Sequence, residues 1–374
     1  MAGLYFHIPF CKRICAYCDF YKSADRRYLP ALLEAMHAEL EARREYLGPE
    51  PVTTRYVGGG TPSLCTPEQL GALLRHAEVL FDHSALEEST LEANPDDLSP
   101  ASLEAFRRVG FDRLSLGIQS LDDACLRLMN RRHTAEQAIR AVRDARAAGF
   151  RNITVDLIFG VPGFGGESLR RTVEGVLALG VEHISAYHLT IEPNTAFGRR
   201  QARGEFAPVE EAESEAQYAY VEQALPGVGY EHYEISNYAR PGYRARHNSA
   251  YWRGVKYLGI GPAAHSFDGE ERRWAVASVK GYLDGVSYEV ERLTRTDRFN
   301  EYLLTRLRTA EGLSLREVES MFGADYQRHI LQQGAGWLAR GVLHHEGDRL
   351  RIPTAHFLLS DAVIGALFQV KGER

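Results

Sequence analysis

The 374-residue sequence has few cysteines, no long apolar run and no excess of basic residues. An odd count of five cysteines argues against a disulfide-stabilised secreted domain. No apolar run reaches the ~20 residues of a membrane-spanning helix, and Met1-Ala-Gly-Leu lacks the features of a secretory leader. A net charge of −6 is opposite to a nucleic-acid-binding footprint. We therefore expect a cytoplasmic protein with no nucleic-acid partner and no membrane span; peripheral membrane contact stays open.

Short β-rich runs alternate with longer helical patterns, which is typical of an α/β fold with a parallel sheet. Gly110, Gly149 and Gly180 each stand just past a helical pattern, where a left-handed residue commonly ends a helix. The predicted strands are 3–8, 53–58, 88–93, 112–118, 152–159 and 183–190. The predicted helices are 28–47, 67–80, 100–109, 122–129, 134–148 and 166–179.

Three cysteines follow the first predicted strand with the spacing C-x3-C-x2-C: Cys11, Cys15 and Cys18. Thiolates are preferred ligands of zinc and of iron–sulfur clusters. Three of them leave one position for another residue or for a small molecule. A zinc site completed by His7, an apolar helix face and a disulfide are the alternatives. The other two cysteines, Cys65 and Cys125, have no C-x-x-C partner and are interpreted as structural or incidental.

A triple glycine follows the second predicted strand, in Val57-Gly58-Gly59-Gly60-Thr61-Pro62. Glycines there would let the backbone approach a ligand without a Cβ in the way. Polar residues also stand at or near the ends of the later strands, where a barrel-like fold places its site. These are Glu92, Gln119 and Asp156.

The cysteine spacing and the glycine motif together resemble the radical S-adenosylmethionine (SAM) superfamily. The resemblance implies a partial (β/α)6 TIM-like barrel with a [4Fe–4S] cluster on Cys11, Cys15 and Cys18, whose open iron is chelated by SAM. It also implies the residues that contact SAM. These are Tyr5, Gly59, Gly60, Thr61, Glu92, Gln119, Arg131 and Asp156, with Tyr17 near the adenine.

Several further blocks, including Leu91–Pro95, Gly117–Ser120 and Asp156–Pro162, are similar to the oxygen-independent coproporphyrinogen III oxidase (HemN) family. Two features differ from the oxidase itself. Phe20 stands where the oxidase has a further cysteine, and only two residues precede Gly3 here. Both make oxidative decarboxylation of a porphyrinogen the alternative function rather than the first.

The block His247-Asn-Ser-Ala-Tyr251-Trp252 resembles the HNxxYW motif of the HemW group of heme chaperones. That resemblance implies heme as a third cofactor and an unidentified heme-acceptor protein as partner. A neutral imidazole is a suitable axial ligand to heme iron, and the two aromatic rings supply flat apolar area. His265 is a second candidate ligand. The leading hypothesis is thus a binding protein rather than an enzyme, and a zinc-binding structural protein is the third.

The chain divides into three predicted parts. Residues 1–200 form the radical SAM core with its cluster and SAM sites, 201–290 complete that core and carry the HNxxYW motif, and 291–374 form a smaller C-terminal α+β domain. Helices at 297–309, 315–322 and 330–338 and a hairpin around Glu346-Gly347-Asp348 make this last part winged-helix-like. An acidic helix is expected within 205–223.

Overall fold

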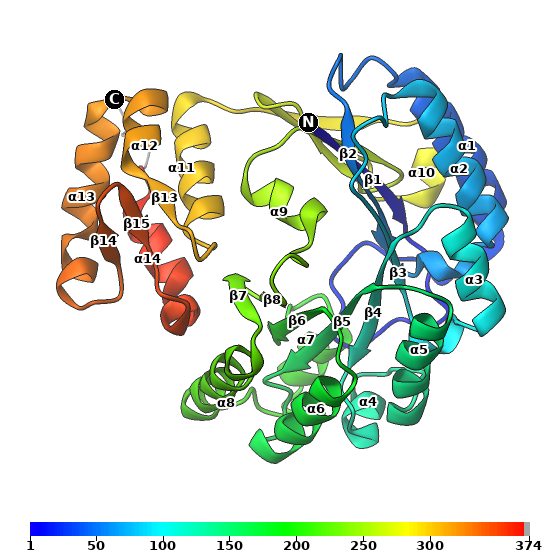
Figure 1. Cartoon of the computed structure of the whole chain (residues 1–374), viewed down its shortest axis with the longest axis horizontal. Helices are drawn as coiled ribbons and strands as arrows, with labels where there is room; N and C mark the ends of the chain where they lie inside the picture. Colours follow the sequence, from blue (N-terminus) through cyan, green and yellow to red (C-terminus); the bar gives the residue numbers. More distant parts are fainter. Residues whose placement is uncertain (370–374) are drawn as a thin grey trace.

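The fold, a computed structural model describing residues 1–369, consists of a large curved sheet and a small C-terminal domain beside it (Figure 1). Six parallel strands form the centre of the sheet, and helices cover its outer face (Figure 1). The strands are β1 (Ala2–Ile8), β2 (Val52–Gly59), β3 (Glu88–Ala93), β4 (Arg113–Gln119), β5 (Asn152–Phe159) and β6 (His183–His188). The helices that follow them are α1 (Leu29–Ala42), α2 (Pro67–Leu80), α3 (Pro100–Arg108), α4 (Asp123–Leu128), α5 (Ala135–Ala147) and α6 (Gly166–Ala178).

The predicted α/β class and the six βα units are confirmed. Each central strand pairs in parallel with the next, from β1 to β6. Thr66 caps α2 with a reciprocal bond to Gln69. Gly110, Gly149 and Gly180 have φ angles of 109°, 93° and 62° and end their helices in the left-handed region.

Later strands extend the sheet at both edges without closing it. The complete order is β12-β11-β10-β9-β1-β2-β3-β4-β5-β6-β8-β7. Residues 201–290 therefore contribute strands to both ends, and the three-part division of the chain stays a prediction. The added elements are α7 (Ala196–Ala202), α8 (Glu211–Ala224), β7 (Glu231–Glu234), β8 (Asn237–Ala239), α9 (Arg246–Trp252), β9 (Tyr257–Ile260), β10 (His265–Phe267), β11 (Glu271–Ala275), α10 (Val279–Asp284) and β12 (Tyr288–Arg292).

The C-terminal domain packs helices around a three-stranded antiparallel sheet of order β13-β15-β14. Ser314 caps its second helix, and Gly347, with φ 59°, lies in the predicted hairpin turn. The third predicted helix is longer than its apolar pattern, because α13 begins at Ala324. The elements are α11 (Arg295–Arg306), β13 (Leu313–Ser314), α12 (Leu315–Phe322), α13 (Ala324–Ala339), β14 (His344–Glu346), β15 (Arg349–Arg351) and α14 (Ser360–Leu367).

The core lies between the parallel strands and their helices. Leu4, Phe6 and Ile8 of β1 are fully buried. By contrast, Glu92, Asp156 and Tyr187 retain exposure among buried neighbours on β3, β5 and β6. Because side chains alternate along a strand, this pattern identifies the inner face of the sheet as partly accessible. Within residues 1–369, no helix combines the length and apolar character needed to cross a bilayer.

Candidate functional site

The cysteine loop leaves the carboxyl end of β1 and is closed by backbone hydrogen bonds. Ser23 N–H donates to the Pro9 carbonyl (2.8 Å), and Cys11 N–H donates to the Ser23 carbonyl (3.0 Å). Ala16 N–H reaches the Met129 carbonyl (3.0 Å) and so ties the loop to the end of α4. The loop contains no helix, and all five cysteines, which lie within the described residues, are free thiols. The helix-face and disulfide alternatives are therefore wrong.

Two polar side chains reach the cysteine sulfurs. Thr61 Oγ1 donates to Cys11 Sγ (3.7 Å), and Arg131 Nη1 donates to Cys15 Sγ (3.3 Å). Burial raises the pKa of the Cys11 thiol to about 11. A thiolate at that position consequently needs a metal or the neighbouring cation to stabilise it.

The arrangement suits a cluster better than a single zinc ion. Across residues 1–369, no three histidine, cysteine or acidic side chains converge as they would around one metal ion. His7, the proposed fourth zinc ligand, contacts the Tyr5 hydroxyl through Nδ1 (2.9 Å) and the Tyr21 carbonyl through Nε2 (3.4 Å). A four-iron cube binds its thiolates at separate irons, so the three sulfurs need not meet at one point. The half-buried thiols on one loop fit such a cluster.

The triple glycine also has a packing role within the protein. A Cβ on Gly59, where φ is 110°, would lie 2.7 Å from the His7 ring, and one on Gly60 would lie 2.7 Å from the Phe10 carbonyl oxygen. The Gly59 and Gly60 N–H groups donate to Glu92 (3.1 Å) and to the Ile8 carbonyl (2.8 Å). The glycines thus let β2 pack against the cysteine loop. Their contact with SAM stays a prediction.

Glu92 lies on the inner face of the sheet and accepts a hydrogen bond from the Tyr56 hydroxyl (2.6 Å). Burial, with a smaller contribution from the nearby Asp156, raises the pKa of Glu92 to about 7. Burial likewise raises the pKa of Asp156 to about 6, against hydrogen bonds from Ser185 and Ser115. A cation placed between these carboxylates would restore their ionised forms.

Gln119 is held in an uncommon backbone conformation. Its φ is 68°, and the pairing of β4 with β5 is irregular between Gly117 and Gln119. Bulges of this kind re-aim a side chain at the end of a strand, and left-handed non-glycine residues cluster at functional sites. A Cβ on Gly117 would come within 2.9 Å of Gln119 Nε2. Gln119 Nε2 therefore lies directly over the Gly117 backbone, and a side chain at position 117 would displace it.

Tyr5 lies on β1 and Tyr17 lies within the cysteine loop, and the two have different surroundings. The Tyr5 hydroxyl contacts His7, and burial raises its pKa. Tyr17 packs against the apolar cluster that contains Cys125 and Met129. Cys65 and Cys125 are both buried, as expected for structural thiols.

His247 is buried against the inner face of β2, where α9 contacts the sheet (Figure 1). Its Nδ1 contacts Thr54 Oγ1 and its Nε2 contacts the Tyr251 hydroxyl, both at 2.8 Å. The Glu88 carboxylate accepts from the His247 N–H (3.0 Å) and so fixes the start of the helix. Both ring nitrogens are therefore engaged, and ligation of iron by His247 would require these bonds to be exchanged.

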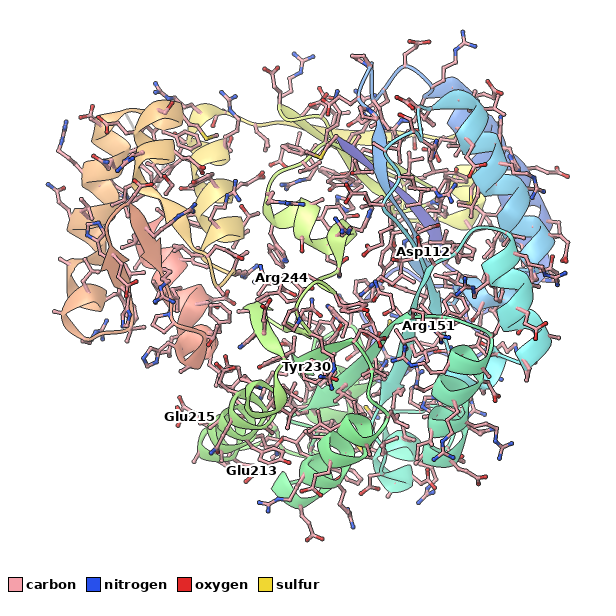
Figure 2. The ribbon with its side chains drawn as sticks, viewed as in Figure 1. Asp112, Arg151, Glu213, Glu215, Tyr230 and Arg244 are labelled. Carbon is pink, nitrogen blue, oxygen red and sulfur yellow. The ribbon has the colours of Figure 1, made fainter. Side chains whose placement is uncertain are left out.

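The aromatic residues of the HNxxYW motif face two different cavities. Tyr251 lines a cavity of about 820 Å³ that also reaches Tyr5 and His7. Trp252 lines a second cavity of about 470 Å³, with Arg244 and Arg349, and Arg253 and Arg306 line both cavities. Figure 2 places Arg244 beside β7, on the side that faces the C-terminal domain. His247, Tyr251 and Trp252 consequently do not form one continuous surface.

Sequence reasoning missed the residues that support these groups from other strands. Tyr56, Thr54 and Glu88 contact Glu92 or His247, yet each reads as an ordinary strand residue in the sequence. Ser115 and Ser185 contact Asp156 in the same way. In the sequence, the only indication of these supporting residues is that they lie on the predicted strands that carry Glu92 and Asp156 or on the strands next to them.

Comparison with known proteins accounts for this arrangement. A family model described as "Radical SAM superfamily" matches residues 5–176, and one described as "HemN C-terminal domain" matches residues 293–358. The solved structure of coproporphyrinogen III oxidase (HemN) from Escherichia coli aligns with a TM-score of 0.86 at 23% identity, covering 98% of this chain and 90% of that chain. The chain belongs to the radical SAM superfamily, and membership implies a [4Fe–4S] cluster and SAM.

Individual relatives identify a narrower family within this superfamily. "Heme chaperone HemW" of Mycobacterium tuberculosis (strain CDC 1551 / Oshkosh) is 37% identical, over 98% of this chain and 94% of that protein. "Heme chaperone HemW" of Bacillus subtilis (strain 168) is 33% identical, over 98% and 99% respectively. Within the radical SAM superfamily, this chain belongs to the HemW family.

Proposed function

We propose that this protein binds heme and passes it to an acceptor protein, as a heme chaperone built on a radical SAM core. The observation that carries the proposal is the 33–37% identity, over 96% or more of this chain, to proteins named heme chaperones. A cytoplasmic location and an unidentified acceptor protein are part of the proposal.

In this proposal Cys11, Cys15 and Cys18 would hold the cluster. The cluster would supply an open iron and a transferable electron. Thr61 and Arg131 would stabilise the thiolates through the hydrogen bonds already present. Glu92 and Asp156 would orient the cationic end of SAM, because ionised carboxylates favour a nearby positive charge. Tyr5, Gly59, Gly60 and Gln119 would complete the SAM site, with Tyr17 beside the adenine.

The proposal is tested by hemin titration of the anaerobically reconstituted protein. We expect about four irons per chain after reconstitution and a saturable Soret band on addition of hemin. A colourless protein with one bound zinc would contradict the cluster, and an unchanged hemin spectrum would contradict heme binding.

The oxidase alternative is tested separately. The reduced, SAM-loaded protein should leave coproporphyrinogen III unchanged, because Phe20 replaces the further cysteine of that enzyme. Formation of protoporphyrinogen would overturn the proposed function and establish an enzyme instead.

A further inference from the structure

The cavity of about 820 Å³ lies between the sheet and the C-terminal domain. Tyr5, His7 and Tyr257 line it from the sheet, and Arg298 and Met321 line it from α11 and α12. Its volume is in the range of roughly 300–1,000 Å³ typical of small-molecule and cofactor sites. It also touches the cysteine loop at Asp19 and Phe20, so its occupant would lie next to the cluster and SAM sites.

Large apolar side chains are exposed toward this cavity from both walls. Phe20 is 73% exposed and Met321 is 57% exposed, and both line it. Tyr257 and Phe267 add aromatic rings from β9 and β10, with their centroids 6.5 Å apart. Exposed apolar residues that gather on two facing walls indicate a flat apolar ligand between them.

The rim of the cavity is positively charged. Arg253, Arg298 and Arg306 line it, and within residues 1–369 none of the three forms an ion pair. Arg272 is paired with Glu301 and Glu291. Among the described residues, two acidic side chains line the cavity, Glu301 and Asp19. Three unpaired guanidinium groups suit carboxylates, which arginine binds in a bidentate manner.

Two histidines line the cavity, and they differ in availability. His7 is buried and engaged at both ring nitrogens. His265 is exposed, stacks on Trp274 (centroids 5.4 Å apart) and has no hydrogen-bond partner at its ring among the described residues. Burial of part of the ring and the neighbouring Arg272 lower the pKa of His265. A neutral imidazole is the form that ligates iron.

The backbone that presents His265 is strained. Ala263 has a φ of 62° and lines the cavity two residues before His265. Two glycines permit the close backbone approach. A Cβ on Gly259 would lie 2.0 Å from the His265 carbonyl oxygen, and a Cβ on Gly261 would lie 2.5 Å from the His7 carbonyl oxygen. Left-handed non-glycine residues persist where the surrounding structure holds a functional side chain in place.

We propose that heme binds in this cavity, with its iron ligated by His265 and its carboxylates held by Arg253, Arg298 and Arg306. Phe20 and Met321 supply apolar contact to the macrocycle. This inference rests on the proposed function, since it locates the heme that the chaperone carries. It moves the iron ligand from the buried His247 of the HNxxYW motif to a histidine with free ring nitrogens.

The test is a hemin titration of the reconstituted full chain, followed by the Soret band in difference spectra. His265→Gly should shift the band and weaken hemin binding about tenfold or more, and added imidazole should restore the wild-type band. His247→Gln, which can keep hydrogen bonds to Thr54 and Tyr251, should retain the band. His345→Ala is the matched control, because His345 is an exposed histidine on β14 outside the cavity.

A second experiment tests the proposed arginine contacts to the heme carboxylates. Arg298→Ala combined with Arg306→Ala should weaken the binding of hemin but not of hemin dimethyl ester, which lacks the two negative charges. Wild-type protein that binds no hemin would overturn the proposed function. Wild-type binding that is unchanged in His265→Gly, or lost in His247→Gln alone, would overturn this site while leaving the proposed function intact.

Discussion

At the scale of single residues, Arg131 connects the cysteine loop to the strands. Its guanidinium donates to Cys15 Sγ (3.3 Å), to Asn94 Oδ1 (2.8 Å) and to the Gly117 carbonyl. Asn94 donates in turn to Thr61 (3.2 Å), whose hydroxyl reaches Cys11. One cation and one amide thereby link two of the three thiols to the ends of β2, β3 and β4.

Replacing this cation should loosen the cluster. In Arg131→Met we expect cluster retention to fall about 10- to 100-fold, the usual effect of removing a group that supports metal ligands. The measurement is iron per chain after reconstitution and dilution into chelator. Arg127→Met, at an exposed position of α4, is the control. Equal iron retention in both variants would contradict the role assigned to Arg131.

Glu92 should make stability depend on pH. Its folded-state pKa is about 7, against an ordinary value of 4.5, because it is buried. Between these values the folded chain keeps a proton that the unfolded chain releases, so the free energy of unfolding falls as pH rises from about 4.5 to 7. Glu92→Gln should remove its share of this change in the free energy of unfolding, at most about 3 kcal/mol over that pH range.

The measurement is urea unfolding of the cluster-free protein at several values between pH 5 and 8. Other buried carboxyls titrate in the same range, so the difference between wild type and variant isolates Glu92. Glu104→Gln, exposed on α3, is the control and should keep the wild-type slope. A Glu92→Gln slope equal to that of the wild type would refute the assignment.

At the scale of elements, the turn after β2 packs against the start of the cysteine loop that follows β1. The Gly60 N–H bonds the Ile8 carbonyl, and its missing Cβ leaves room for the backbone of Pro9 and Phe10. The cysteine loop and the β2 turn therefore form one packed unit, although Cys11 and Thr61, which are in contact, lie 50 residues apart in the sequence.

Gly60→Ala should disrupt this unit. The added Cβ would meet backbone atoms at 2.7 Å, which cannot yield as a flexible side chain does, so we expect a loss of about 1–3 kcal/mol and a lower iron content. Gly336→Ala in α13 is the matched control: its Cβ meets nothing within 4 Å, and it should stabilise the protein by about 0.4–1 kcal/mol. Urea midpoints and iron content of the two variants decide the outcome.

The central strands, the caps and the cysteine loop could be predicted because each depends on neighbouring residues. Thr66 caps α2 through Gln69, three residues later. The environment of His247 could not be predicted, because its partners Thr54 and Glu88 lie far away in the sequence and meet it only across the folded sheet. The motif identified the family without revealing which of its side chains are accessible.

At the scale of the whole molecule, two sets of contacts attach the C-terminal domain. Beside the large cavity, Arg272 of β11 pairs with Glu301 of α11. The second set involves α8 and the β7–β8 region. Ile235 N–H donates to the Arg308 carbonyl (2.9 Å), the Tyr218 hydroxyl donates to the Thr354 carbonyl, and Arg244 pairs with Glu311. These contacts join α8 and the β7–β8 region to the domain. The large cavity lies beside the first set, between the β1–β9–β10 part of the sheet and α11–α12.

Hemin bound in that cavity should protect both of its walls from amide hydrogen exchange. We expect hemin to slow amide hydrogen exchange in 253–267 and 298–306, because a bound ligand suppresses local opening of the segments it bridges. Helix α2 (67–80), on the outer face of the sheet, is the internal control and should not change. Protection confined to the sheet side would show that the C-terminal domain takes no part in binding.

The sheet that begins at β12 and ends at β7 never returns to itself. A closed barrel admits a ligand only at its ends, whereas this sheet leaves an opening between β12 and β7, and residues 308–310 of the C-terminal domain hydrogen-bond to the β7 side of it. If heme leaves by this opening, as the proposed function would require, every strand pair stays intact, so delivery to an acceptor would require no unfolding of the protein.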